Sequence, residues 1–194
     1  MSEKTEQKRQ LIIESAVKVF AEKGYKTVTM KDLVDAAEIS RGGLYLYFSS
    51  VEEVFLAVLD YTEKQNENDL SRTQLQNASN TEMLLYFFKM QKKQIVNRKK
   101  NLLLARLEYA FYCKQESKPC VLKKEMNEER LILQKMLERG NESGEFDCYN
   151  PKGEAANIIY ALEGMKMMAC MTGISDKKID EEFLYLMQGF VTEE

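Results

Sequence analysis

Hydrophobic residues recur at helical spacing through almost the whole chain. One early stripe consists of Ile13, Ala16, Val17 and Phe20, and the next consists of Met30, Leu33, Val34 and Ala37. Spacing of i, i+3, i+4 and i+7 places each set on one face of an α-helix. The sequence shows no alternating strand pattern and contains only two prolines. It therefore predicts an all-α fold.

Capping residues place the starts of two short helices close together. Thr29 precedes the second stripe and has Asp32 three residues later, which is typical of a capping box and predicts a helix from Met30. Ser40 is a second cap residue, in front of a further helix. Only a sharp turn with Ile39 pointing inward fits between them, so the two helices should cross steeply.

The helix that follows Ser40 is unfavourable by propensity alone. Gly42 and Gly43 are adjacent, and each glycine inside a helix costs about 1 kcal/mol relative to alanine. Glycine in a first turn lets the backbone approach a phosphate or a base edge without an intervening side chain. Leu44 and Phe48, four residues apart, are expected to face inward. The side chains left to face outward are Arg41, Tyr45 and Tyr47, whose donors suit guanine edges and phosphates.

The residues on both sides of these two helices extend the helix-turn-helix motif. It comprises the first-helix stripe, Lys23-Gly24-Tyr25, Thr27, Thr29, Asp32-Leu33, Ile39-Ser40-Arg41-Gly42, Leu44-Tyr45, Tyr47-Phe48 and the capping box Ser50-Val51-Glu52-Glu53. With these residues, the stretch from about Arg9 to Leu56 resembles the DNA-binding region of the TetR family of bacterial transcriptional repressors.

The resemblance implies a nine-helix TetR-like architecture. Residues 1–50 would form a three-helix helix-turn-helix domain, and residues 51–194 a larger helical domain for ligand binding and dimerisation. It also implies that the helix from Ser40 to Tyr47 enters the major groove, while Thr29 and Lys31 approach from the preceding helix. The predicted DNA-binding residues are Thr29, Lys31, Ser40, Arg41, Gly42, Gly43, Tyr45 and Tyr47.

Three positions depart from the family pattern. Val34 replaces a common alanine, and Glu38 replaces the usual turn glycine, which predicts a slightly strained or opened turn. Val51 replaces a lysine that often contacts phosphate, and its spacing with later apolar residues indicates packing instead. The missing phosphate contact would then be absent or come from one of three cations near the N-terminus, namely Lys4, Lys8 or Arg9.

The chain beyond residue 50 keeps its helical pattern. The fourth helix is predicted from Val51 toward Gln76, the fifth from about Thr81 to Asn97 and the sixth from Asn101 to Lys114. Pro119 suits the start of a seventh helix that reaches Arg139 before Gly140. The eighth is predicted from Asn150-Pro151 to about Met171, and the ninth from Ser175-Asp176 to near Val191.

Charge and composition narrow the classes of function. The net charge is −3, with a balance of +1 over residues 1–50, so DNA binding would rely on a few cations and on two copies acting together, with strong salt dependence. The absence of histidine excludes histidine-based catalysis and histidine metal sites, and no glycine-rich phosphate loop occurs. We therefore expect no enzyme activity, no cofactor and no metal.

Cysteine usage and hydropathy bear on the compartment. The four cysteines are Cys113, Cys120, Cys148 and Cys170, with no CxxC pair, which favours buried thiols in a reducing compartment over disulfides or a zinc site. No stretch has the length and apolarity of a membrane span, and the charged first ten residues lead into no signal region. The sequence predicts a cytoplasmic protein.

The last two predicted helices are more apolar than one neighbouring helix requires. A four-helix interface between two copies would cover both, although the same residues could simply be core. The predicted dimer-interface residues are Ile158, Leu162, Phe183, Leu186, Met187 and Phe190.

Aromatic and methionine residues on the middle helices are candidates for an adaptable ligand pocket, although most such residues are ordinary core. Glu108 and Glu163 lie among apolar neighbours, where a carboxylate needs either a cationic or hydrogen-bonding ligand or a salt bridge to an adjacent helix. The predicted ligand-binding residues are Tyr86, Met90, Glu108, Tyr109, Tyr112, Glu163 and Met168.

Together these patterns predict a transcriptional repressor. A dimer would present two recognition helices about one turn of DNA apart, roughly 34–36 Å, and bind a near-palindromic operator. A small hydrophobic or cationic ligand would shift the fourth helix and release the DNA. The alternative is a helical carrier or interaction module that keeps the fold without binding DNA.

Overall fold

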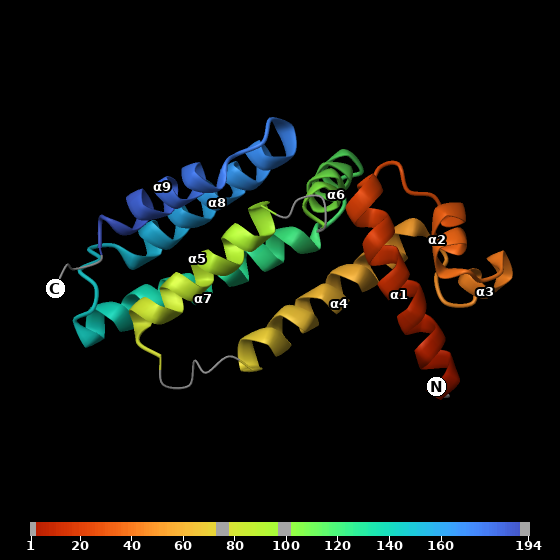
Figure 1. Ribbon diagram of the computed structural model, residues 1–194, viewed down its shortest axis with the longest axis horizontal. Helices are drawn as coiled ribbons and strands as arrows, with labels where there is room; N and C mark the ends of the chain where they lie inside the picture. The colour runs from red at the N-terminus through yellow and green to blue at the C-terminus, as the bar shows by residue number, and fades with distance from the viewer. Residues whose placement is uncertain (1–2, 73–77, 97–101, 191–194) are drawn as a thin grey trace. The chain divides into compact units, whose positions relative to one another are not determined.

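The computed structural model describes residues 3–72, 78–96 and 102–190. Within these ranges the chain forms helices and no β-strand, as the sequence predicts. The helices are α1 (Glu3–Lys23), α2 (Met30–Ala37), α3 (Arg41–Tyr45), α4 (Val51–Arg72), α5 (Asn80–Val96), α6 (Leu103–Gln115), α7 (Val121–Ser143), α8 (Pro151–Met171) and α9 (Asp176–Met187), labelled in Figure 1. All four cysteines are free thiols, as predicted, and Cys113 and Cys148 are buried.

The chain packs as two compact units. Unit 1 comprises residues 1–73 and 98–116, and unit 2 comprises residues 74–97 and 117–194. Unit 1 thus holds α1 to α4 together with α6, and unit 2 holds α5, α7, α8 and α9. This division differs from the sequence-based boundary between residues 50 and 51, because α4 and α6 complete the core of unit 1.

Five aromatic rings form the centre of that core. α1 packs against α2, α4 and α6 (Figure 1). The ring centroid of Tyr25, just after α1, lies 5.0 Å from that of Phe55 on α4, 5.0 Å from Tyr109 and 5.3 Å from Tyr112. Phe20 contacts Phe55 at 4.8 Å. Because three separate helices contribute rings, removing α6 would leave part of this core exposed.

Two carboxylates attach α6 to the rest of unit 1. Glu108 on α6 accepts hydrogen bonds from the backbone amides of Tyr25 and Lys26, at 2.7 and 2.8 Å. Gly24, with φ +75°, makes this approach possible, since a Cβ there would overlap the Glu108 carboxylate. Glu52 on α4 accepts from the Tyr109 hydroxyl at 3.2 Å, and burial raises the pKa of Tyr109, which keeps that donor protonated.

Capping fixes the start of α2. Thr29 Oγ1 accepts from the Asp32 amide, and the Asp32 carboxylate accepts from the Thr29 amide at 2.8 Å, so the predicted capping box is confirmed. Asp32 also pairs with Lys23 at the end of α1, with Nζ to Oδ1 at 2.6 Å. The hydrogen bond from Lys23, followed by those from Thr29, lowers the pKa of Asp32 to about 2.

The turn between α2 and α3 carries the strain that the sequence predicts at Glu38. Its φ is +52°, in the left-handed region that favours glycine, and its amide and that of Ile39 donate back to the carbonyls of Asp35 and Val34. The side chain gains no compensating partner from this backbone geometry, so the turn is locally unfavourable.

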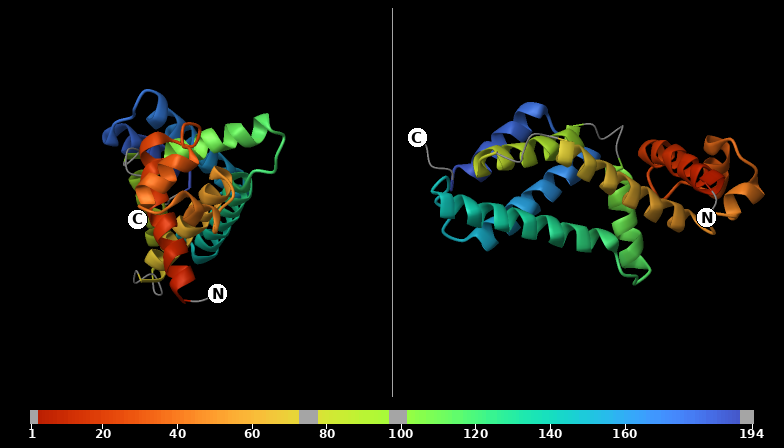
Figure 2. Two further views of the ribbon diagram at one scale, coloured as in Figure 1. Left: turned by 90° about the vertical axis from the view of Figure 1, so that its right-hand side faces the viewer. Right: turned by 90° about the horizontal axis from the view of Figure 1, so that it is seen from below.

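In unit 2, α7 and α8 form an antiparallel pair joined by residues 144–150 and packed along α5 (Figures 1 and 2). Glu145 in this connection accepts hydrogen bonds from the backbone amide and side chain of Asn80 and from the Thr81 amide. One carboxylate therefore caps α5 and fixes it to the end of α7. The buried core includes Leu84, Phe88, Leu133, Leu137, Ile158, Leu162 and Ile179.

Most predicted helix starts are confirmed, including Met30, Arg41, Val51 and Pro151. The predicted end of the seventh helix is wrong, since α7 continues through Gly140 to Ser143. Gly140 is required for space, because a Cβ there would overlap the Phe146 ring, and the left-handed residue that ends the helix is Gly144, with φ +77°. α9 ends at Met187, earlier than predicted. The predicted end of α4 at Gln76 lies outside the described residues.

We expect Glu145→Gln to lower the Tm by several degrees at neutral pH, because a neutral amide accepts the Asn80 and Thr81 hydrogen bonds less strongly. Hydrogen bonds, first that from Thr81, lower the pKa of Glu145 from 4.5 to about 2. A lowered pKa means that the stabilisation is complete above the unfolded pKa and is lost as the pH falls through the folded one.

Thermal denaturation from about pH 7 to about pH 3 measures this difference. The Tm gap between the wild type and the variant should stay constant above about pH 5 and narrow below it. Glu142→Gln, at an exposed position on α7, is the matched control. An unchanged gap at all pH values would contradict the assignment.

We expect Glu38→Gly to raise the free energy of unfolding by about 0.5–1 kcal/mol, because glycine adopts the left-handed conformation without steric cost. The control is Glu22→Gly, at an exposed helical position of α1, which should lower it by about 1 kcal/mol. Urea denaturation measures both. Changes of the same sign would exclude backbone strain at Glu38.

Candidate nucleic-acid interface

α3 is a short helix held by its cap and by two buried side chains. The Ser40 hydroxyl oxygen accepts from the Gly43 amide at 3.0 Å, which confirms the predicted cap. Leu44 and Phe48 are buried in unit 1, as predicted. Because the inward side chains are fixed, the opposite side of α3 has a defined set of outward residues.

The two glycines of α3 have different surroundings. A Cβ at Gly43 would lie 3.1 Å from Ser40 Oγ, so this glycine leaves room for the cap. A Cβ at Gly42 would meet nothing within 4 Å. Gly42 is therefore not required by packing within the protein, and its missing side chain leaves the α3 backbone open to an external partner.

The outward side of α3 combines charge, aromatic rings and one apolar side chain. The Arg41 guanidinium lies over the Tyr45 ring, 5.8 Å from its centroid, and both residues are exposed. Leu46, directly after α3, is 83% exposed. Sequence reasoning missed Leu46, although its apolar side chain falls between two outward tyrosines that the motif singled out.

Three further predicted DNA-binding residues differ in whether a hydrogen-bond donor is still available for DNA; they are Thr29, Ser40 and Lys31. Thr29 donates its hydroxyl to Asp32 Oδ2 at 2.8 Å, so the α2 cap uses this group. Ser40 uses only its oxygen in capping and keeps its hydroxyl proton. Lys31 is exposed on α2. Of these three, Ser40 and Lys31 can donate to a phosphate without breaking a cap.

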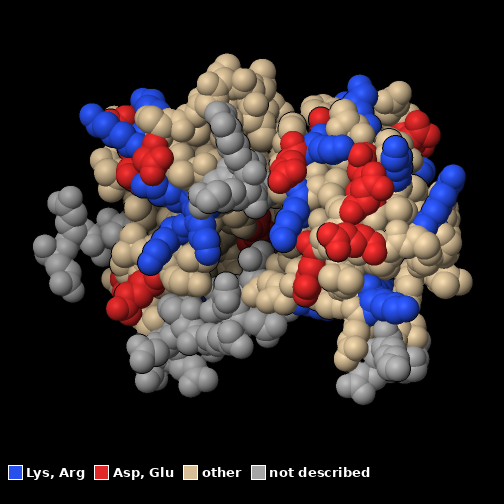
Figure 3. Space-filling model, turned by 45° about the vertical axis from the view of Figure 1, so that its right-hand side comes forward, with Lys and Arg blue, Asp and Glu red and all other residues tan. Residues whose placement is uncertain are grey.

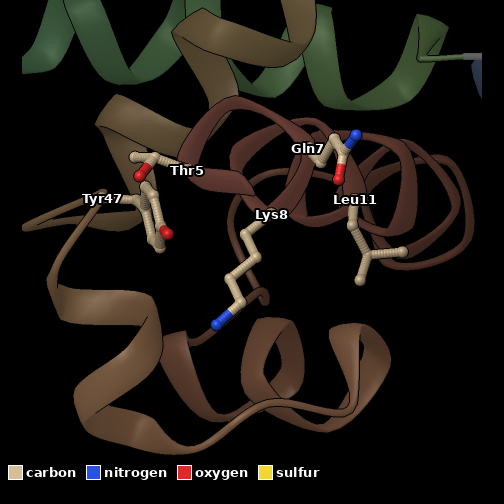
Figure 4. A pocket seen from close by; sticks show the side chains of 5 residues that line it. All are labelled: Thr5, Gln7, Lys8, Leu11 and Tyr47. Carbon is tan, nitrogen blue, oxygen red and sulfur yellow. The ribbon is translucent and has the colours of Figure 1, made fainter. Parts of the chain in front are cut away.

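A groove of about 310 Å³ lies between α1 and the segment after α3, lined by Thr5, Gln7, Lys8, Leu11 and Tyr47. Figure 4 shows Lys8 extending from α1 into this space and Tyr47 at its side. Arg9, the next residue, instead places its guanidinium 5.2 Å from the centroid of the buried Phe48 ring. Lys8 is thus the cation of this groove, and Arg9 packs against the core.

Positive charge on the visible surface is interspersed with negative charge. Figure 3 shows lysine and arginine side chains next to aspartate and glutamate on the face that it presents, without a large basic patch. A second hollow on α1 is acidic, with Glu6 and Glu14 among its lining residues. The Lys8 groove is the better place for a phosphate because its lining holds no carboxylate.

The predicted ligand-binding residues are divided between the two units. Glu108, Tyr109 and Tyr112 belong to unit 1, where Glu108 holds backbone amides and the tyrosines pack in the aromatic core. The carboxylate of Glu108 thus has hydrogen-bond donors within unit 1. In unit 2, Glu163 pairs with Lys166 of its own helix at 2.7 Å, Tyr86 and Met90 are half-buried on α5, and Met168 is exposed on α8. The α1 groove and hollow include none of the seven.

The predicted dimer-interface residues differ in how far they are exposed on one chain. Ile158 and Leu162 are fully buried within one chain, and Phe183 and Phe190 nearly so, leaving no surface for a partner. Leu186 and Met187 are half-buried. The apolar side chains that do face outward on these two helices, here called the α8–α9 outer face, are Tyr160, Met167, Met168, Met171, Leu184 and Tyr185.

Two searches of the described residues gave negative results. Within residues 3–72, 78–96 and 102–190, no helix is long and apolar enough to cross a bilayer. The same residues contain no group of three or more cysteine, aspartate or glutamate side chains arranged to hold a metal ion.

Comparison with known proteins agrees with this geometry. Residues 12–58 match the family model described as bacterial regulatory proteins, tetR family. The chain is 51% identical over 49 residues to the uncharacterised HTH-type transcriptional regulator YfiR of Bacillus subtilis, covering 25% of this chain and 24% of YfiR. It is 38% identical over 47 residues to the probable acrEF/envCD operon repressor of Escherichia coli K12, covering 24% and 21%.

These curated relatives are therefore matched over about a quarter of their length or less. The fold is similar over almost the whole chain to a crystal structure of a TetR transcription regulator from Haloarcula marismortui, with a TM-score of 0.83 at 14% identity, covering 96% of this chain and 100% of that one. Residues 12–58 thus match the tetR family of bacterial regulatory proteins, and the chain shares the fold of a TetR transcription regulator.

Proposed function

We propose that the protein is a ligand-responsive transcriptional repressor that binds a near-palindromic DNA site as a homodimer. The observation that carries the proposal is the outward side of α3, where Arg41, the open Gly42, Tyr45 and the exposed Leu46 project from a helix fixed by a buried Leu44. The tetR-family match over residues 12–58 supports it, as does the Bacillus subtilis relative, which is named an HTH-type transcriptional regulator. The name of the Escherichia coli relative supports repression.

In this proposal α3 lies in the major groove, and each outward residue contacts either a base or a phosphate. Arg41 leaves the Tyr45 ring to donate to a guanine edge, and Leu46 contacts a thymine methyl group. Gly42 allows the backbone to approach the bases. Lys8 and Tyr47 hold a phosphate in the α1 groove, and Lys31 and Ser40 donate to neighbouring phosphates.

Dimerisation would bury the α8–α9 outer face. On α8 its members are spaced i, i+7, i+8 and i+11, so they form one stripe, and on α9 Leu184 and Tyr185 are 59% and 68% exposed. Apolar stripes of this kind on two neighbouring helices suit a two-fold four-helix contact. A dimer also raises the effective concentration of the second α3 at the DNA, which helps a chain whose residues 1–50 have a net charge of only +1.

The effector would be a small molecule bound in unit 2, and the site of action would be the cytoplasm, where bacterial DNA lies. The competing function is a helical carrier or interaction module that keeps the fold. The two differ at α3, because a carrier loses nothing when Arg41 or Tyr45 is replaced.

We expect Lys8→Ala to weaken DNA binding about threefold to tenfold near 0.1 M salt and to lower the slope of log K against log salt by about 1 per protomer, since one phosphate contact is lost. The probe is a labelled palindromic duplex from the DNA upstream of the protein's own gene, followed by fluorescence anisotropy over a salt series. Lys18→Ala, at an exposed position of the same helix, should change neither quantity.

Arg41→Ala is measured alongside and should abolish preference for this duplex over a scrambled one. If both Lys8→Ala and Arg41→Ala bind like the wild type, α3 does not read DNA and the carrier function is favoured. If Lys18→Ala weakens binding as much as Lys8→Ala, the α1 groove has no special role.

We expect Leu184→Lys to convert the dimer into a monomer, because a buried unpaired ammonium is costly at an apolar interface. Sedimentation equilibrium measures the mass, and affinity for the palindromic duplex should fall by at least about tenfold with the loss of the second recognition helix. Ile132→Lys, at an exposed apolar position of α7, is the control. A dimer that survives Leu184→Lys and dissociates with Ile132→Lys would place the interface on α7 instead.

A further inference from the structure

Buried polar residues of unit 2 come together at one height of the helix bundle. α7 and α8 run antiparallel from the turn between Ser143 and Pro151. Glu129 lies 14 residues before the end of α7 and Lys166 lies 15 residues after the start of α8. At 1.5 Å per residue, both are about 21–23 Å from the turn. Gln91 on α5 reaches the same level, because it is hydrogen-bonded to Glu129.

Gln91 is the exceptional member of this group. Its side chain is 2% exposed, and its Nε2 donates to Glu129 Oε1 at 2.8 Å. Its Oε1 is buried and has no hydrogen-bond partner among the described residues. Exchanging the two amide atoms would set an oxygen against the Glu129 carboxylate, so the pairing fixes the orientation. An unsatisfied acceptor therefore faces the core beside a carboxylate.

The charge at this level is negative. Lys166 is 7% exposed, but its ammonium is already paired with Glu163 at 2.7 Å. That pair is neutral overall, and no ion pair among the described residues involves the half-buried Glu129 next to Gln91. The group that would satisfy both is a cationic donor, since it supplies an N–H to Gln91 Oε1 and a positive charge to Glu129.

A buried aromatic residue lies one turn from Gln91 on the same helix. Phe88, one turn earlier on α5, is buried and contacts the Phe183 ring at 4.7 Å. A buried acceptor without a hydrogen-bond donor destabilises the fold, whereas a leucine at the same position would not. Such destabilising groups are often retained for function, for example where a bound ligand supplies the missing donor.

We propose that Gln91 and Glu129 are the polar anchor of an effector site in unit 2, and that the effector is a small ammonium compound with an apolar or aromatic body. This inference rests on the proposed function, since it names the class of ligand to which the repressor responds. Neither residue was among the ligand-binding residues predicted from the sequence.

The first test requires no ligand. Gln91→Leu removes the unsatisfied acceptor at similar side-chain volume, so the Tm of the ligand-free protein should rise by a few degrees. Gln188→Leu, at an exposed position directly after α9, is the matched control and should leave the Tm unchanged. A Tm that falls in Gln91→Leu would mean that the amide supports the fold, and would overturn the proposal.

The second test uses three probes of similar size: 2-phenylethylamine, which is cationic at neutral pH, 2-phenylethanol, which is a neutral donor, and 3-phenylpropionate, which is an anion. Thermal shift titrations of the wild type should give the largest Tm increase with the amine and none with the anion. Gln91→Leu should weaken binding of the amine at least fivefold. Glu129→Gln should remove the preference for the amine over the alcohol.

Equal shifts with all three probes, no shift with the amine, or the same shift in wild type and Gln91→Leu would each overturn the proposal. These measurements use the full chain without DNA, so they are independent of the DNA-binding tests. An amine response in a protein that ignores the palindromic duplex would leave this site standing and remove the repressor function. DNA binding without an amine response would remove this site alone.

Discussion

The position of the outward side chains of α3 depends on the rest of unit 1, because a helix of five residues is too short to be stable in water on its own. Its first turn contains two glycines, so propensity gives it no help. What holds it is the Ser40 cap and the burial of Leu44 and Phe48 in unit 1. The positions of Arg41 and Tyr45 are therefore set by the core beneath them, and a change in that core acts directly on the surface that we propose to contact DNA.

That core extends to α6, although α6 is distant in sequence. Glu108 holds two backbone amides 83 and 82 positions earlier, just before the loop that leads into α2. Tyr109 packs on Tyr25 and Phe55 while its hydroxyl donates to Glu52 on α4. These hydrogen bonds and ring contacts join α1, α4 and α6. A displacement of α6 must therefore either break them or move the segment between α1 and α2 with it.

Local structure was predictable from the sequence, and long-range pairing was not. The caps at Thr29, Ser40 and Asn150 depend on residues within three positions, so pattern reading found them. The end of α7 was misplaced because Gly140 is needed for the ring of Phe146, a packing reason that spacing does not reveal. Helical periodicity identifies the apolar residues of α8, but it cannot tell which of two apolar sides meets the core, where Ile158 is buried.

The polar residues among apolar neighbours show most clearly what the sequence leaves open. Glu108 and Gln91 look alike in the sequence, each a polar side chain in an apolar stripe. In the fold, Glu108 accepts two backbone hydrogen bonds and fixes α6, so its cost is offset within the chain. Gln91 satisfies only its donor, and its buried acceptor remains open beside Glu129. A satisfied polar group in a core is accounted for within the chain, whereas an unsatisfied one keeps the full cost of its desolvation, which is why we place the proposed effector site at Gln91.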